Sequence, residues 1–335
     1  MKCFVTGATG FVGSNLVHEL VARGHRVRAL VRPGPDDRAL LGVKCERVTG
    51  DILDRALLER ELAGCNWCFH VAAHYQLWLR NYAPMYQANV EGTRTVLAAA
   101  GKAGCDRIVF TSTAMCVGHA KNVGGKIIPA TESDLATPED LAGDYVRSKF
   151  QAEAVAVELF RQQGLPIVIV NPTMPIGPGD AKPTPTGKLI LDYLARRLPA
   201  YLDTGLNWVH IRDVAAGHIL AAEKGTLGQR YILGNKDGNW TLPQTFAALE
   251  ELTGIAGPHK KIPHWLAVRV AEVGEMVAAV TGHPPRVPMA GVKLAAHKMW
   301  FSPARAIREL GLPQTPPLQA FADAITWFRA NGMVK

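Results

Sequence analysis

Tyr145 and Lys149 stand four positions apart in a segment, Tyr-Val-Arg-Ser-Lys, that has the composition of a helix. At this spacing the two side chains lie on one face of a helix and can interact. A phenol has an ordinary pKa of about 10 and is a weak catalyst near neutral pH, but a neighbouring ammonium favours its ionised form. The pair is therefore suited to exchanging a proton with a substrate oxygen.

A hydroxyl group is expected to join this pair. Thr113 directly follows residues 107–112, an apolar run that predicts a strand. The carboxyl ends of strands in an open parallel sheet face the ligand crevice, so a hydroxyl there can polarise a substrate carbonyl. Neighbouring Ser112 is an alternative for the same role.

Three glycines, Gly7, Gly10 and Gly13, separate a predicted strand from a predicted helix at the start of the chain. The first glycine permits a tight turn, the second lets a pyrophosphate approach the backbone, and the third lets helix and strand pack closely. The free N–H groups and the positive dipole end of the helix then face the phosphates. This arrangement predicts a dinucleotide cofactor.

Arg32 ends the second predicted strand, where an NAD site usually has an acid for the ribose 2′-hydroxyl. A guanidinium there can bind a 2′-phosphate instead. We therefore expect NADP(H) to be favoured over NAD(H), with a side chain that merely points into solvent as the alternative.

The elements that must position these residues alternate between short apolar runs and helical stretches, which is typical of a doubly wound parallel sheet. The predicted strands are 2–6, 26–31, 44–48, 67–71, 107–112 and 166–171, and the predicted helices between them are 11–23, 56–62, 82–103 and 144–163. Beyond residue 171 the chain changes to a Pro- and Gly-rich irregular segment, 172–187, and then to helices predicted at 242–253, 265–281 and 318–331. The fold class is thus α/β, a Rossmann-type sheet with a smaller, mostly helical C-terminal substrate-binding portion.

The domain boundaries follow from this change of texture. Residues 1–172 form the dinucleotide-binding domain, with a strand and a helix contributed from about 204–235, while 173–203 and 236–335 form the smaller portion.

The composition excludes a disordered chain, because 48% of the 335 residues are hydrophobic and 20% are charged. The net charge is 37 − 29 = +8, and residues 255–335 contribute 10 − 4 = +6 of it. Those charges are scattered among apolar residues, so we expect no nucleic-acid partner. The chain has no apolar run of ~18 residues, and two glycines interrupt its first eleven, so we expect neither a transmembrane segment nor export, and a cytoplasmic location.

The six cysteines include one Cys-x-x-Cys, formed by Cys65 and Cys68. A structural zinc site needs four ligands, and no second pair accompanies this one. We therefore expect buried, unreactive thiols and no metal.

The glycine turn, Thr113 and the Tyr145/Lys149 pair together resemble the extended branch of the short-chain dehydrogenase/reductase superfamily, and the resemblance covers essentially the whole chain. It implies that Tyr145 is the acid–base group, that Lys149 lowers its pKa and holds the nicotinamide ribose, and that Thr113 replaces the usual serine. Asn89 matches the helix asparagine that supports the active site.

The resemblance also implies a cofactor site. Gly50-Asp51-Ile52 is similar to the branch's adenine contact and His70-Val-Ala72-Ala73 to its strand-four signature. With Arg32, the predicted cofactor-binding residues are Gly7, Thr9, Gly10, Phe11, Val12, Gly13, Asp51, Ile52, Ala72, Ala73, Tyr145, Lys149, Pro172 and Thr173.

Residues 171–179, 182–188, 203–218 and 327–332 look like the hopanoid-associated sugar epimerases, and the chain also resembles dihydroflavonol reductases and 3β-hydroxysteroid dehydrogenase/decarboxylases, including bacterial sterol C-4 demethylation reductases. Leu206 stands where sugar-nucleotide epimerases usually have an arginine for the diphosphate. The resemblance therefore favours a reductase acting on a hydrophobic cyclic or isoprenoid-type substrate. A nucleotide-sugar epimerase or dehydratase remains an alternative, and so does a non-catalytic dinucleotide-binding protein.

Apolar and aromatic residues at the predicted strand ends suit a bulky, weakly polar ligand. The predicted substrate-binding residues are His74, Trp78, Met115, Met174, Ile176 and Trp208. For any one of them, closing the core is an equal alternative. Residues 265–281 are expected to form a packed helix, and a cap over the pocket or a peripheral membrane contact are the alternatives. We expect the chain to be a monomer or a homodimer.

Overall fold

The computed structural model describes residues 1–34, 38–137 and 140–334. Its larger sheet has seven parallel strands in the order β11-β8-β5-β4-β1-β2-β3. The strands are β1 (Lys2–Thr6), β2 (Arg26–Val31), β3 (Glu46–Thr49), β4 (Trp67–His70), β5 (Arg107–Thr111), β8 (Ile167–Pro172) and β11 (Arg230–Leu233). The predicted α/β fold is confirmed.

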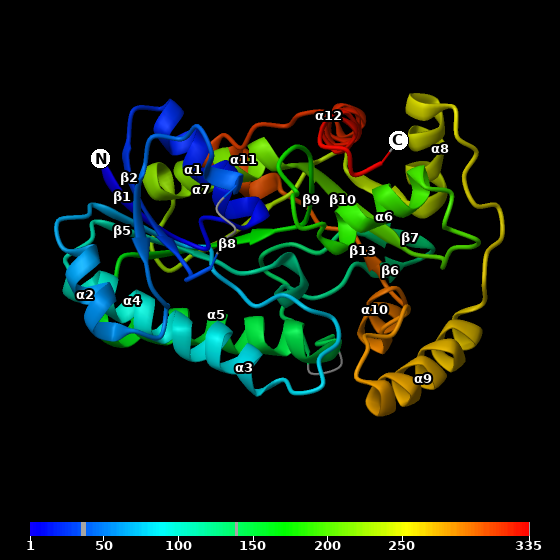
Figure 1. The fold of residues 1–335 in the computed structure, drawn as a ribbon, viewed down its shortest axis with the longest axis horizontal. Helices are drawn as coiled ribbons and strands as arrows, with labels where there is room; N and C mark the ends of the chain where they lie inside the picture. The colour runs from blue at the N-terminus through cyan, green and yellow to red at the C-terminus, as the bar shows by residue number, and fades with distance from the viewer. Residues whose placement is uncertain (35–37, 138–139, 335) are drawn as a thin grey trace.

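Helices cover both faces of this sheet, so its central strands are mostly apolar (Figure 1). One face carries α1 (Phe11–Ala22), α7 (Ile211–Lys224) and α11 (Ala304–Leu310). The other carries α2 (Arg55–Leu62), α4 (Gly92–Lys102) and α5 (Gly143–Gln163). The carboxyl ends of the strands consequently open at one edge, where the predicted site residues lie.

The smaller part of the molecule contains four strands, three of which lie outside the region, about 204–235, where a strand was predicted. They are β9 (Met174–Ile176), β10 (Gly205–His210), β12 (Asn239–Thr241) and β13 (Lys298–Met299), and β10 pairs with each of the other three. The helices α6 (Pro185–Leu194), α8 (Leu242–Thr253), α9 (His264–Thr281), α10 (Met289–Leu294) and α12 (Pro317–Ala330) complete it, and a hairpin, β6 (Lys121–Val123) with β7 (Lys126–Ile128), lies beside it (Figure 1). This part is mostly helical, as predicted.

One segment differs from the prediction. The stretch 172–187, expected to be irregular throughout, contains β9 and the first turn of α6. Within 204–235, α7 packs on the larger sheet and β11 is one of its strands, while β10 is the central strand of the smaller sheet. Within the described ranges, no helix is both long and apolar enough to cross a membrane.

Candidate active site

The predicted cofactor turn joins β1 to α1 with very little space inside it. Gly7 has a left-handed backbone, φ +68°, and its carbonyl accepts a hydrogen bond of 2.9 Å from the Gly10 amide. A Cβ on Gly13 would lie 2.1 Å from that carbonyl oxygen, so only glycine fits. The N-terminus of α1 has no acidic side chain in its first turn and no side-chain cap. These features fit a bound pyrophosphate, with Thr9, Phe11 and Val12 half-buried around the turn.

The Thr6 hydroxyl fixes this turn to the next strand. Its Oγ1 accepts hydrogen bonds from the Val71 and Ala72 amides, each 3.2 Å, and lies 2.8 Å from His70 Nδ1. Gly7 presses on Ala72, since a Cβ at Gly7 would lie 2.6 Å from the Ala72 nitrogen. Ala72, one of the predicted cofactor-binding residues, therefore lines the turn, while Ala73 is exposed.

Arg32, Asp51 and Ile52 lie together at the ends of β2 and β3, where the Gly50 amide donates to the Val31 carbonyl. Arg32 is exposed, and its charge contributes, after burial, to lowering the pKa of His74. Asp51 accepts the Leu53 amide at 2.9 Å. An exposed guanidinium at this corner is available to a ribose phosphate.

Tyr145 and Lys149 both lie on α5, but they do not form a direct pair in the structure. The Lys149 ammonium is buried, donates to the Thr111 carbonyl at 2.6 Å and lies 4.7 Å from the centre of the Phe110 ring. Burial lowers the pKa of Lys149 to about 8. The pKa of Tyr145 is raised well above its usual value, chiefly by burial, rather than lowered by Lys149 as expected.

The ring of Tyr145 is held by a second tyrosine. Tyr75, in the loop after β4, places its ring centre 4.3 Å from that of Tyr145. This contact could not be predicted from the sequence, because nothing in local spacing determines where the loop returns to α5. Tyr75 thus orients the phenol.

Thr113 is buried at the end of β5, where its hydroxyl accepts from the Met115 amide at 3.4 Å. Its carbonyl accepts from Asn171 Nδ2 at 3.0 Å, and the same nitrogen donates to Glu153 at 3.0 Å. Arg230 lies 3.4 Å from Glu153 and balances its charge. No hydrogen bond joins Thr113 to Tyr145 within the described residues. Thr113 lies at the end of β5, and Tyr145 lies on α5.

Asn89 lies in a single turn of π-helix, Gln87–Glu91, where one continuous helix was predicted over 82–103. Its side chain donates to Ser148 Oγ at 2.8 Å and to the His74 carbonyl at 3.1 Å, and it accepts from the His74 amide at 2.7 Å. Extra residues in one turn re-aim a side chain, which is common at functional sites. Asn89 therefore ties the loop after β4 to the residue preceding Lys149.

The predicted substrate residues occupy two kinds of environment. Met115, Met174 and Ile176 are buried in one apolar cluster against which Tyr145 and Leu77 also pack. His74 and Trp78 are half-buried. Trp208 instead lies in the core, 0% exposed, with its indole nitrogen donating to Thr245. Its strand is sandwiched between helices, so Trp208 is not available to a ligand, which corrects the prediction.

Pro172 and Thr173 end the strand β8 and are buried. The Thr173 hydroxyl donates to Asn207 Oδ1 at 2.9 Å and so joins the larger sheet to the smaller one. Two surface hollows of about 380 and 470 Å³ lie elsewhere, around α11, and no predicted site residue lines them.

Further polar residues complete the site without having been predicted. His70 Nε2 contacts Thr93 Oγ1 at 3.0 Å, and Thr93 donates to the Asn89 carbonyl at 2.6 Å. Burial, followed by the nearby Lys149 charge, lowers the pKa of His70 to about 3, so the imidazole is neutral. All six cysteines are free thiols, and among the described residues no cluster of three His, Cys, Asp or Glu side chains suits a metal ion.

Comparison with known proteins agrees with this geometry. Residues 3–234 match the model of the NAD dependent epimerase/dehydratase family. A putative dihydroflavonol 4-reductase of Synechocystis sp. is 47% identical over 99% of this chain and 96% of its own length. Sterol demethylase protein B of Methylococcus capsulatus is 36% identical over 100% of both chains.

Among solved structures, a nucleoside-diphosphate-sugar epimerase from Pseudomonas aeruginosa superposes with a TM-score of 0.80 at 26% identity, covering 100% of this chain and 99% of that one. The match extends over both parts of the molecule. The chain belongs to the NAD dependent epimerase/dehydratase family, the extended branch of the short-chain dehydrogenases/reductases, and is an NAD(P)-dependent oxidoreductase.

Proposed function

We propose that the protein uses NADP(H) to interconvert a carbonyl and a secondary alcohol on a hydrophobic cyclic or isoprenoid-type substrate, such as a sterol- or hopanoid-like ring system. The observation that carries this proposal is the apolar cluster against which Tyr145 packs, in which Met115, Met174 and Ile176 keep only 2–7% exposure. A diphosphate would require charged or polar partners there, whereas a ring system is stabilised by burying its apolar area. The names of the two relatives, a dihydroflavonol reductase and a sterol demethylase, support the same class.

The residues present fit the cofactor, since the glycine turn and the uncapped N-terminus of α1 suit its pyrophosphate. The exposed Arg32 is the group that we propose for its 2′-phosphate. The cofactor supplies or accepts the hydride when bound. In the reducing direction Tyr145 donates its phenolic proton to the substrate oxygen, and Thr113 orients that oxygen by hydrogen bonding.

Lys149 and Asn89 act on the other groups of the site. Lys149 supplies the charge that stabilises the phenolate formed when Tyr145 gives up its proton. Asn89 keeps the loop after β4 attached to α5, which preserves the position of Tyr75 against Tyr145. Positioning of this kind is worth several kcal/mol of barrier in well-ordered sites.

A substrate screen tests the proposal. Oxidation of NADPH is followed spectrophotometrically with sterol or hopanoid ketones in one set and UDP-sugars in the other. The proposal predicts turnover with the ring ketones, abolished in Tyr145→Phe while dinucleotide binding measured by calorimetry is retained. The phenylalanine ring can still contact Tyr75, so retained binding is expected, and loss of binding in this variant would mean that Tyr145 is structural.

A nucleotide-sugar epimerase is the second candidate, favoured by the matched family and by the solved epimerase structure. Against it, Leu206 is buried in the apolar cluster at the position expected for a diphosphate-binding arginine. Conversion of UDP-sugars alone in the same screen would establish this candidate and reject the proposed substrate class.

A further inference from the structure

Helix α9 presents an apolar face that nothing in the described structure covers. Seven of its side chains are between 37% and 84% exposed, namely Trp265, Leu266, Val270, Val273, Met276, Val277 and Val280. Isolated exposed apolar residues are ordinary, but a contiguous patch of this kind marks an interaction surface. The helix expected from the sequence is present, but this face of it packs against no element of the described structure.

Helical geometry gathers these residues on one side. At 100° per residue the seven fall within an arc of about 140°, and α9 lies at the outer margin of the molecule (Figure 1). On the opposite side Ala267, Ala271 and Ala278 are buried, with Val292 of α10 in the same cluster as the first two. The helix thus rests on small residues and turns its large ones outward.

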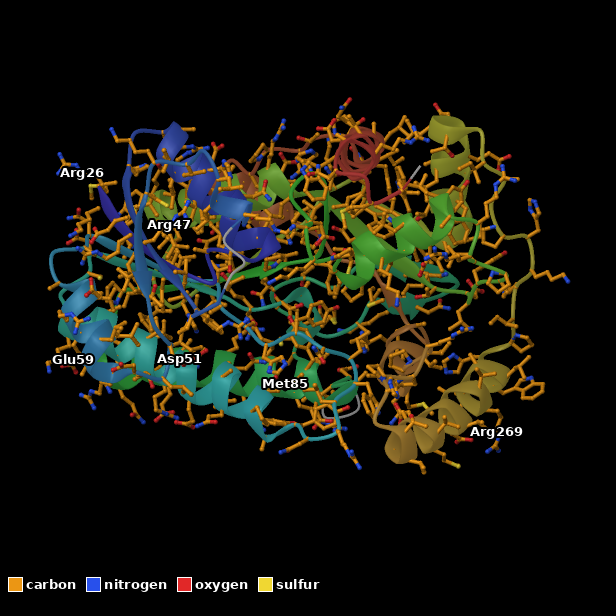
Figure 2. The ribbon with its side chains drawn as sticks, viewed as in Figure 1. Arg26, Arg47, Asp51, Glu59, Met85 and Arg269 are labelled. Atoms are coloured by element: carbon orange, nitrogen blue, oxygen red, sulfur yellow. The ribbon has the colours of Figure 1, made fainter. Side chains whose placement is uncertain are left out.

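The two glutamates of α9 do not interrupt this face. Glu272 accepts from Arg269 at 2.8 Å, and Glu275 accepts from the Met289 amide at 2.9 Å, which draws it toward α10. Arg269 is the one charged residue inside the apolar arc, and Figure 2 shows it pointing away from the body of the molecule. Among the residues of α9, the apolar arc therefore carries one positive charge and no carboxylate.

Basic groups flank both ends of the apolar face. Exposed Lys260 and Lys261 precede α9, with Lys261 paired to Asp203 at 2.7 Å. Exposed Arg286 follows it, and the Arg80 guanidinium lies beside Gly282 at its C-terminus. Residues 255–300 hold six Lys/Arg and two Glu, a net of 6 − 2 = +4, and Asp203 pairs with two of these lysines, Lys261 and Lys298. A second copy docking through this face would bring the basic groups of both copies together, whereas an anionic surface would complement these charges.

We propose that the apolar face of α9 docks the protein on an anionic lipid bilayer. An apolar helical arc with basic residues at its borders is the pattern of a helix that lies in the membrane interface. Its large side chains enter the boundary between headgroups and acyl chains, while Arg269 and the flanking basic residues contact lipid phosphates.

The docking face adjoins the candidate site. Helix α10 packs on α5 at Gly143, where Ala290 sits in contact, and Gly291 lies beside Leu77 of the loop after β4. A lipid-soluble substrate would then reach the site from the surface on which the protein is docked. This last step rests on the proposed function, but the docking itself does not.

The experiment measures co-sedimentation of the purified chain with vesicles of phosphatidylcholine, with and without added phosphatidylglycerol. Val273→Glu/Val277→Glu places two charges in the centre of the face at exposed positions, so folding is retained. Leu41→Glu, at a similarly exposed apolar residue in the turn between β2 and β3, is the matched control. Analytical ultracentrifugation of all three proteins without lipid reports self-association.

The proposal predicts that wild type and Leu41→Glu bind the anionic vesicles, that salt weakens this binding, and that the double variant binds about tenfold more weakly or worse. Absence of wild-type binding, or equal binding by the double variant, overturns it. A dimer that the double variant dissociates would instead assign the face to a second copy. None of these results depends on the substrate, so a failed substrate screen would leave the docking test standing.

Discussion

Replacing Lys149 with methionine should make the folded protein more stable near neutral pH while removing its activity. Burial lowers the pKa of Lys149 from 10.5 to about 8. The difference, 10.5 − 8, corresponds to about 3 kcal/mol by which the buried, charged ammonium destabilises the folded state. Methionine removes this cost but also the 2.6 Å hydrogen bond to the Thr111 carbonyl, a loss of about 1–2 kcal/mol. A net gain of about 1–2 kcal/mol is expected.

The pH dependence has a definite sign. Below about pH 8 Lys149 is charged in both folded and unfolded states, so the folded state bears the full cost. Between about pH 8 and 10.5 the unfolded state binds the proton more readily than the folded state, so the contribution of Lys149 to stability rises with pH. The advantage of Lys149→Met should therefore shrink across this window.

Urea unfolding of the two proteins without nucleotide, followed by circular dichroism from about pH 6 to 10, measures this difference. Lys126→Met is the control, because Lys126 is exposed in the hairpin of β6 and β7 and its replacement should leave no comparable trend. A methionine variant that is less stable than wild type at pH 7, with a gap that stays constant as pH rises, would refute the reasoning.

Three further changes test other parts of the site. Gly13→Ala should lower the affinity for dinucleotides by at least about tenfold, because its Cβ would lie 2.1 Å from the Gly7 carbonyl oxygen. The affinity is measured by calorimetric titration. The control is Gly274→Ala, because a Cβ on this helical glycine would make only an ordinary van der Waals contact. Arg32→Ser should weaken the binding of NADPH about tenfold or more and change the binding of NADH little. A wild-type preference for NADH would contradict the assignment of Arg32 to the 2′-phosphate. Asn89→Ala should lower kcat more than it changes KM, since it removes bonds that position the loop after β4, and unchanged kcat would give Asn89 no role in catalysis.

The sequence was sufficient for the framework of the larger sheet. The predicted strands at 2–6 and 26–31 have the observed bounds of β1 and β2, because buried parallel strands are continuous apolar runs between turn residues. The strand predicted at 44–48 is observed at Glu46–Thr49, since this edge strand is mostly exposed and carries a weaker pattern.

The smaller sheet was not predicted, because β9, β12 and β13 have only two or three residues and their partner β10 is distant from them in the chain. Gly205 of β10 pairs with Lys298 of β13, and Trp208 pairs with Met174 of β9. No periodicity develops within a strand of two or three residues. The same reason hid the burial of Trp208, which depends on what packs over its strand.

The site residues that could be predicted from the sequence are those whose positions depend on local spacing. Spacing alone put Tyr145 and Lys149 on one helix and Thr113 at a strand end. The rotamer of Lys149, which points at Thr111 rather than at the phenol, depends on tertiary packing. So does the return of Tyr75 onto Tyr145, which no local pattern encodes.

The strand order has a consequence for how the chain is made. Strand β8 lies between β5 and β11 and is buried along its whole length, yet β11 is separated from it by residues 173–229. Until Arg230–Leu233 has left the ribosome, β8 is an edge strand that exposes unpaired amide groups beside apolar side chains, the arrangement most prone to aggregation. A nascent or truncated chain ending before residue 230 should therefore require a chaperone, although it already contains the glycine turn, Thr113, Tyr145 and Lys149.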